Sequence, residues 1–399
     1  MFFKQVFLIC ALGVGLLAQS GSFDLKAVYA KFLHKNPKLE GLQAQIDSLQ
    51  AQAQAVSRWD NPILYVGYNN ADVNNFFILD SSFMQSISVG LSQKFDLNGK
   101  RHTQSQVINL ERQKKLLELK KLKQEMAINI LINGINVYKN TRKLSLLKES
   151  LKNLNNLLYR AQHSTSPDLI AIAKIEILKS QLEIKENELQ DALEDNKINI
   201  SELSFNQGDL LSLAPKVLDF NPSVEIQAIM DSNRDIKIAV LQNSQAHKNV
   251  ILAKKSFLED VNVTANYLFR SKIFDMFTIG VAIPLPIYGK QHNTLQQRKQ
   301  EQLAASKGIE DTTNKVRHNA QKLLKKIAQL QKNLTSIDQI LDSSARIVHI
   351  YENNLASSPD YNGYYNAFNE AINIQISKID TLSALSVAYL NLQNLKGLD

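Results

Sequence analysis

The chain has 399 residues and a formal net charge of +8, and it contains only 14 Gly and 8 Pro. Scarce Gly and Pro, together with abundant Leu, Lys, Gln, Asn and Ala, predict long helices rather than a deep globular core. Charges of both signs are mixed along the chain, without basic clusters or interleaved aromatic residues. We therefore predict a solvated helical surface and no nucleic-acid partner.

The first predicted element is a secretory signal peptide over residues 1–20. Lys4 precedes an apolar run that is too short to span a bilayer, and Ala18 and Ser20 supply the small residues for cleavage after Ser20. The only cysteine, Cys10, lies inside this run, so we predict a mature chain without a disulfide or a thiolate metal site. No later segment is apolar for about 18 uninterrupted residues, so no transmembrane helix is predicted.

Residues 21–203 form the first predicted repeat. Apolar spacings of three and four residues indicate helices, and strict alternation indicates strands. Asn-Pro and Ser-Pro-Asp sequences mark the breaks between them. In chain order we predict a helix over 24–57 with a break at Asn36-Pro37, a strand over 63–68, a loop over 69–82, a strand over 86–96, a helix over 100–163 and a returning helix over 168–203.

Residues 204–223 form a predicted linker with Gly208, Pro215 and Pro222, and residues 224–399 form the second repeat. Its pattern follows the first closely. In chain order we predict a helix over 224–258, a strand over 261–270, a short loop over 271–275, a strand over 277–287, a helix over 291–357 and a last helix that runs nearly to the C-terminus.

The two repeats share sequence marks at nearly constant offsets. At an offset of 190 residues, the matching positions are Gly90 with Gly280, Gly99 with Gly289 and Lys100 with Lys290. The sequence Ser166-Pro167-Asp168 recurs as Ser358-Pro359-Asp360. A duplication of this kind predicts two copies of one strand–helix–helix unit.

The strands have one apolar face and one small or polar face. Such alternation fits either a soluble sandwich or an outer-membrane barrel, but strands of about ten residues have the length of membrane-spanning strands. Four strands per chain cannot close such a barrel, so the membrane interpretation requires several chains to share one. In that case we expect Val89, Val263 and Val281 to face lipid, and Ser88, Asn262 and Thr278 to face the lumen.

The long helices carry heptad seams, which predict coiled-coil packing along antiparallel hairpins. The seam residues are Leu144, Leu147, Leu151, Leu154 and Leu158 in the first repeat, and Leu323, Ile327, Leu330, Leu334, Ile337 and Leu341 in the second. We expect Leu330 and Leu334 to be buried between helices of neighbouring hairpins. Shared strands and packed hairpins together predict a tube.

No catalytic motif is present: the chain lacks a P-loop, a G-x-S-x-G sequence and an H-E-x-x-H sequence. The seven histidines are scattered singly, and the repeat alone explains why His102 matches His292. We therefore predict that the protein is not an enzyme and has no cofactor and no metal site.

The sequence resembles the TolC family of outer-membrane efflux channels, in particular the branch that serves heavy-metal and multidrug pumps. The resemblance covers essentially the whole mature chain. The residues that carry it are Asn61-Pro62, Val89-Gly90-Leu91-Ser92-Gln93, Gly99-Lys100-Arg101 and Val281-Ala282-Ile283-Pro284-Leu285-Pro286-Ile287-Tyr288-Gly289. The sequence departs from several relatives in lacking a lipid-anchor cysteine, and its helix turns read Ser-Pro-Asp.

The resemblance implies a mainly α fold with a small β part. A duplicated strand–long-helix-hairpin unit would form, as a homotrimer, a 12-stranded outer-membrane β-barrel continued by a periplasmic α-helical barrel. It places the linker in the equatorial region of that helical barrel. It also implies contact with outer-membrane lipid, with a periplasmic adaptor protein and with an inner-membrane pump of the RND type.

The hairpin turns are the candidate sites. Asp168 and Asp360 open the two returning helices, where a carboxylate stabilises a helix N-terminus, so a capping role alone remains an alternative. In a trimer they would form a ring of carboxylates at the pore mouth, and Glu370 is a lower-ranked pore position. Ser166, Pro167, Ser358 and Pro359 are the predicted adaptor contacts.

The expected function is that of an outer-membrane exit duct in a tripartite efflux system of a Gram-negative bacterium, exporting metal ions, drugs or other small toxic compounds. Two alternatives remain open. One is a periplasmic adaptor, although adaptors have a single hairpin framed by glycine-rich lipoyl halves. The other is the outer-membrane duct of a type I secretion system.

Overall fold

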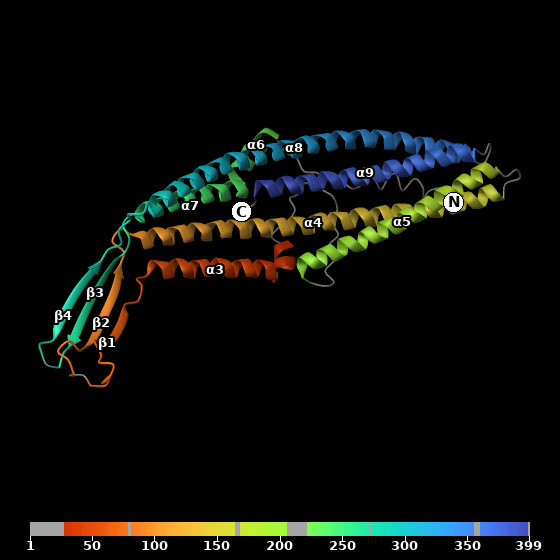
Figure 1. Ribbon diagram of the computed structural model, residues 1–399. Coiled ribbons are helices and arrows are strands. Elements are labelled where there is room, and N and C mark those ends of the chain that lie inside the picture. The colour runs from red at the N-terminus through yellow and green to blue at the C-terminus, as the bar shows by residue number, and fades with distance from the viewer. Residues whose placement is uncertain are drawn as a thin grey trace. The chain divides into compact units, whose positions relative to one another are not determined.

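The computed structural model describes residues 28–78, 81–163, 168–205, 222–271, 273–354 and 360–397. The predicted signal peptide and most of the predicted linker lie outside these residues. The elements are η1 (Tyr29–Leu33), α3 (Pro37–Ser57), β1 (Ile63–Asn69), β2 (Ser86–Phe95), α4 (Lys100–Gln162), α5 (Leu169–Ser204), α6 (Pro222–Ser232), α7 (Arg234–Lys255), β3 (Val261–Phe269), β4 (Met276–Ala282), α8 (Lys290–Asn354) and α9 (Tyr361–Lys396) (Figure 1). The fold is therefore mainly helical with a small sheet, as predicted.

Each Gly-Lys mark begins a long helix. Gly99 and Gly289 have φ angles of +69° and +72°, in the left-handed region that glycine adopts without steric cost. Helices α4 and α8 start at the lysine that follows each of them and run for 63 and 65 residues. Both long helices are confirmed, with starts within one residue of those predicted, whereas the predicted end of the second at residue 357 lies outside the described residues.

Two predicted boundaries are wrong. The helix expected over 224–258 is interrupted at Asn233, which separates α6 from α7 and donates a hydrogen bond of 2.8 Å from Nδ2 to the carbonyl of Leu395. The strand expected over 277–287 ends at Ala282. Pro284 and Pro286 have no backbone N–H to donate to a ladder, so the chain beyond Ala282 cannot continue the strand.

The described residues fall into two compact units, each built from both repeats. The strand unit consists of residues 41–119 and 235–313. Its sheet is antiparallel throughout, in the order β1-β2-β3-β4. The register aligns Tyr65, Gly90, Asn266 and Thr278 in one row across the four strands.

Residues that are paired directly in an antiparallel sheet point to the same side, so the register defines two faces. The polar face consists of Ile63, Tyr65, Gly67, Asn69, Ser86, Ser88, Gly90, Ser92, Lys94, Asn262, Thr264, Asn266, Leu268, Met276, Thr278, Gly280 and Ala282. The apolar face consists of Leu64, Val66, Tyr68, Ile87, Val89, Leu91, Gln93, Phe95, Val261, Val263, Ala265, Tyr267, Phe269, Phe277, Ile279 and Val281.

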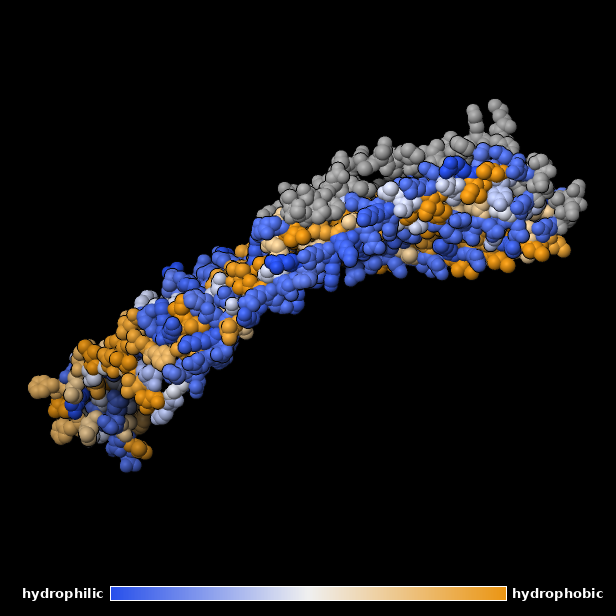
Figure 2. Space-filling view, turned by 90° about the horizontal axis from the view of Figure 1, so that it is seen from above, coloured by the Kyte–Doolittle hydropathy of each residue, from blue (hydrophilic) through white to orange (hydrophobic). Residues whose placement is uncertain are grey.

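Burial in β2 is the reverse of that in a soluble sheet. Ser86 and Ser88 on the polar face are 6% and 8% exposed, whereas Val89 and Leu91 on the apolar face are 36% and 48% exposed. Figure 2 shows hydrophobic side chains gathered on the surface of the strand unit. The predicted alternation is therefore present, and the single chain leaves most of its apolar face uncovered.

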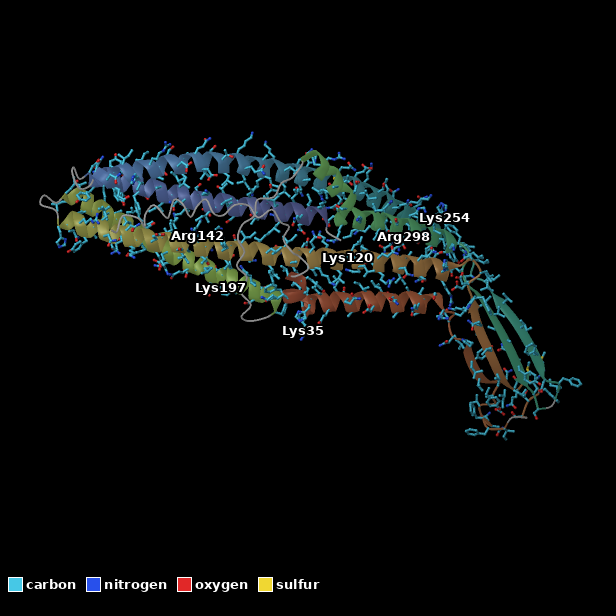
Figure 3. The ribbon with its side chains drawn as sticks, turned by 180° about the vertical axis from the view of Figure 1, so that it is seen from behind. Lys35, Lys120, Arg142, Lys197, Lys254 and Arg298 are labelled. Carbon is cyan, nitrogen blue, oxygen red and sulfur yellow. The ribbon has the colours of Figure 1, made fainter. Side chains whose placement is uncertain are left out.

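The helix unit consists of residues 28–40, 120–234 and 314–397 within the described chain. Its core joins α4, α5 and α9 through Leu147, Leu154, Leu157, Ala161, Ile175, Leu178, Leu182, Tyr364, Ile372 and Ile376. An ion pair of 2.8 Å between Lys378 and Asp338 links α9 to α8. Charged side chains project from the other helix faces, as Arg142 and Lys197 do in Figure 3.

The two heptad seams are buried to different extents. Leu144, Leu147 and Leu154 of the first seam are buried in the single chain. In the second seam only Ile327 is buried, while Leu330 and Leu334 are half-buried. The burial of these two leucines between neighbouring hairpins stays a prediction.

None of the described helices has an apolar stretch of the length and hydropathy needed to cross a membrane.

Candidate functional site

The polar face of the sheet is crowded by its own side chains. Tyr65 and Asn266 occupy the space above Gly90, where a Cβ atom would collide with both. Ser88 Oγ donates a hydrogen bond of 3.2 Å to the carbonyl of Gly67, on the neighbouring strand. Glycine therefore makes room for polar side chains to lie along this face instead of projecting from it.

Hydroxyl and amide groups supply most of the polarity of this face. Ser92 Oγ and Asn262 Oδ1 form a hydrogen bond of 2.9 Å between β2 and β3. The Oδ1 atom of Asn266 is buried without a hydrogen-bond partner among the described residues. Such a surface suits contact with water and polar solutes, as the wall of an aqueous pore requires.

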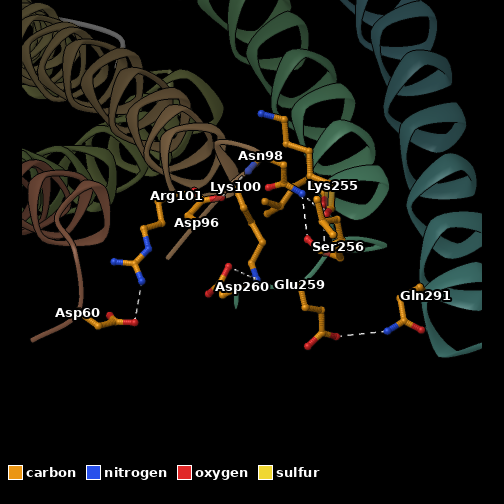
Figure 4. A network of polar contacts seen from close by, with 12 residues as sticks. Asp60, Asp96, Asn98, Lys100, Arg101, Lys255, Ser256, Glu259, Asp260 and Gln291 are labelled. Carbon is orange, nitrogen blue, oxygen red and sulfur yellow. Dashed lines mark hydrogen bonds and ion pairs between the residues drawn. The ribbon is translucent and has the colours of Figure 1, made fainter. Parts of the chain in front are cut away.

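A polar network joins β2 to α4, at the end of the sheet (Figure 4). The Asp96 carboxylate accepts hydrogen bonds from the backbone N–H groups of Arg101, at 2.8 Å, and Asn98, at 3.2 Å. Partial burial raises the pKa of Asp96, but these backbone N–H groups, with those of Lys100 and Gly99, outweigh it and hold the pKa below its ordinary value. Asp96 therefore stays ionised and stabilises the first turn of α4.

The same network ties the first repeat to the second. Lys100 Nζ forms an ion pair of 3.3 Å with Asp260, which precedes β3. Asn98 Nδ2 donates to the carbonyls of Lys255 and Leu258, at 2.6 and 2.9 Å. Lys255 Nζ in turn donates to the carbonyl of Gly99 at 3.0 Å. The positions of β2 and β3 at this end are thereby fixed relative to each other.

Arg101 extends this polar network to the segment that precedes β1. Its guanidinium group forms an ion pair of 2.7 Å with Asp60 and donates to the carbonyl of Arg58, also at 2.7 Å. It lies over the ring of Trp59, which itself contacts Phe95 edge-on at 5.6 Å. Sequence reasoning missed this arrangement, because nothing in the spacing of these residues indicates that they meet.

The two histidines matched by the repeat have different surroundings. His102 Nε2 is 2.8 Å from Gln106 Nε2, whereas the His292 ring contacts Phe257 edge-on. Within the described ranges, no three His, Cys, Asp or Glu side chains gather as metal ligands would.

Asp168 and Asp360 stand immediately before α5 and α9. Asp168 Oδ1 accepts hydrogen bonds from the backbone N–H groups of Ile170 and Ala171, at 3.0 and 3.1 Å. Asp360 Oδ1 accepts one of 2.8 Å from the N–H of Gly363. Both carboxylates therefore cap their helices, and both residues are exposed.

The structure brings the N-terminal ends of these two helices together. Lys174 Nζ of α5 donates a hydrogen bond of 2.9 Å to Asn362 Oδ1 of α9. Glu370 is exposed further along α9, on the order of 15 Å from Asp360 at 1.5 Å per residue. Ser166, Pro167, Ser358 and Pro359 lie outside the described residues.

An aromatic group near the start of α9 was also missed. Tyr364 is 9% exposed and stacks on Phe368, with ring centroids 5.9 Å apart. Burial, reinforced by the nearby Glu352 carboxylate, raises the pKa of Tyr364 to about 12. The spacing of four residues between the two rings was the available signal, because it places both on one side of a helix.

No protein-family model matches the sequence, and no curated protein matches it either. Solved structures do match. The outer membrane protein VceC of Vibrio cholerae has a TM-score of 0.79 at 16% identity, over 94% of this chain and 96% of that one. The MtrE outer membrane channel of Neisseria gonorrhoeae, in its open state, has a TM-score of 0.78 at 15% identity, over 94% and 88%. The CmeC outer membrane channel of Campylobacter jejuni has a TM-score of 0.74 at 14% identity, over 94% and 85%.

Proposed function

We propose that this chain, which has the fold of these outer-membrane channel proteins, is the exit duct of a tripartite efflux system in a Gram-negative bacterium. The duct passes metal ions or small toxic compounds outward from an inner-membrane RND-type pump, to which a periplasmic adaptor connects it. It acts as a channel and not as an enzyme. The observation that carries the proposal is the reversed burial in β2, where apolar side chains are exposed and serines of the polar face are buried.

Assembly as a homotrimer follows from what the single chain leaves unpaired. Strands β1 and β4 are the two edges of the sheet, and exposed edges of this kind invite pairing with another chain. Three copies with four strands each would give a closed barrel of 12 strands. Closure would cover both edges and leave the apolar face toward lipid.

The helices support the same assembly. Along α5 an exposed isoleucine recurs at seven-residue spacing at Ile170, Ile177 and Ile184, and again at Ile198. These side chains are 56–66% exposed in the single chain. A heptad stripe of this kind is typical of a coiled-coil seam, so we assign it to contact with the neighbouring copy.

The test of the proposed function is the behaviour of the native protein. Detergent extracts of the outer membrane should contain trimers that dissociate on heating, and the purified trimers should conduct ions in planar bilayers. Deletion of the gene should sensitise cells to exported metals or drugs. A soluble periplasmic monomer without conductance would contradict the proposal and favour the adaptor function.

We further propose that the turns before α5 and α9 form the periplasmic mouth and meet the adaptor. The contacts would come from Ser166, Pro167, Ser358 and Pro359, while Asp168 and Asp360 of three chains would form a ring of six carboxylates. Rings of carboxylates favour cations in other pores. The hydrogen bond between Lys174 and Asn362 supports the ring, because it joins the N-terminal ends of the two capped helices.

The double substitution Asp168→Asn plus Asp360→Asn is expected to lower cation selectivity while leaving the trimer intact. Asparagine caps a helix about as well as aspartate, so the turns should hold, with a loss of about 0.3–1 kcal/mol per helix from the missing charge. Reversal potentials in planar bilayers measure selectivity, and thermal dissociation measures the trimer. Unchanged cation selectivity would mean that Asp168 and Asp360 act only as helix caps. Glu370 would then be the next position to test.

A further inference from the structure

Lys94 is the only Asp, Glu, Lys, Arg or His within the four strands of the sheet. It lies on the polar face, paired in register with Asn262, which is paired in turn with Ala282. Its side chain is exposed. All the other groups that the strands contribute to this face are uncharged, so one cation per chain determines the charge of the face.

Three carboxylates that flank the strands at this end of the sheet, those of Asp60, Asp96 and Asp260, are already bound elsewhere. Asp96, two residues further on, accepts backbone N–H groups at the start of α4. Asp260 forms an ion pair with Lys100, and Asp60 forms one with Arg101. No ion pair to Lys94 occurs among the described residues, so its charge is not compensated locally.

We propose that Lys94 is the residue that sets ion preference in the strand part of the pore, where three copies form a ring of cations that binds and passes small anions. The inference rests on the proposed function, because a ring requires the trimer. Rings of lysine or arginine select anions in other pores, and a narrow low-dielectric wall strengthens the field of such charges. Chloride, phosphate and carboxylate-bearing solutes are the ligand class that this ring would accept.

Screening limits the range over which each lysine acts. At physiological salt the Debye length is about 8 Å, so Lys94 acts on solutes that pass within about that distance of its ammonium group. The caps Asp168 and Asp360 belong to the helix unit and carry the opposite sign. The two sites should therefore contribute separately, and opposite in direction, to the overall selectivity.

The test is the reversal potential of single channels in a salt gradient. Relative to wild type, Lys94→Gln should shift the chloride-to-potassium permeability ratio toward potassium, and Lys94→Glu should shift the reversal potential about twice as far. The reason is that the trimer loses about three charges in the first case and changes by about six in the second. Lys94→Arg is the matched control and should retain the wild-type ratio.

A second variant separates the effect of the lost charge from a defect in membrane insertion. Because the mature chain is predicted to have no cysteine of its own, channels of Lys94→Cys can be modified after insertion with either a cationic or an anionic thiosulfonate reagent. The cationic reagent should restore the anion preference and the anionic one should reverse it. Absence of reaction, or an unchanged ratio in conducting channels, would overturn the role of Lys94. Absence of wild-type conductance would contradict the proposed function instead.

Discussion

Ile279→Arg is expected to destabilise the membrane-inserted protein by about 2–4 kcal/mol, which is the cost of arginine on the lipid face of a barrel near the bilayer midplane. Ile279 is the central residue of β4, lies on the apolar face and is 67% exposed in the single chain. An arginine there would have to leave water for the hydrocarbon region. In the proposed barrel the polar face would impose no such cost, because it would face an aqueous lumen.

Thr278→Arg is the matched control. Thr278 precedes Ile279 in the same strand, is also exposed and lies on the polar face. The substitution Thr278→Arg places an arginine at about the same depth in the barrel as Ile279→Arg. The free energies of unfolding of the two variants should therefore differ by most of the predicted cost of about 2–4 kcal/mol. Denaturant titration of folding into lipid vesicles measures both. Equal losses, or a larger loss for Thr278→Arg, would mean that the two faces are assigned the wrong way round.

Leu147→Ala is expected to lower the free energy of unfolding by about 2–5 kcal/mol, the range observed for truncating a buried leucine. Leu147 of α4 is 0% exposed and lies in the core that joins α4, α5 and α9. The methyl groups removed would leave a cavity between helices that the backbone cannot easily close.

Lys152→Ala, on the same helix but with an exposed side chain, is the control and should stay within about 0.5 kcal/mol of wild type. Thermal dissociation of the detergent-solubilised protein compares the two variants. A negligible effect of Leu147→Ala would show that this core does not hold the helices together.

Much of the fold is visible in the sequence because its signals are local. Gly99 and Gly289 mark helix starts, since a positive φ angle favours glycine, and alternation identifies both faces of β2. The early end of β4 was also readable from Pro284 and Pro286. The break at Asn233 was not, because its side chain bonds to Leu395, more than 160 residues away.

The candidate site, like the fold, has features that the sequence predicts and features that it does not. The residue types of Asp168 and Asp360 predict their capping role, since Asp before an apolar run is a helix-start signal. The Arg101 junction could not be predicted, because it depends on how β1 and α4 meet in space. Likewise, the isolation of Lys94 on a neutral face appears only once the register of all four strands is known.

The most direct test of the central claim is stepwise modification of single channels that carry Thr278→Cys in a mature chain predicted to have no other cysteine. If three chains line one pore with their polar faces, a charged thiosulfonate reagent should change the conductance of Thr278→Cys channels in three discrete steps. Ile279→Cys channels should show none, because that side chain lies in lipid. Steps at position 279 with none at 278, or a single step at 278, would contradict the account.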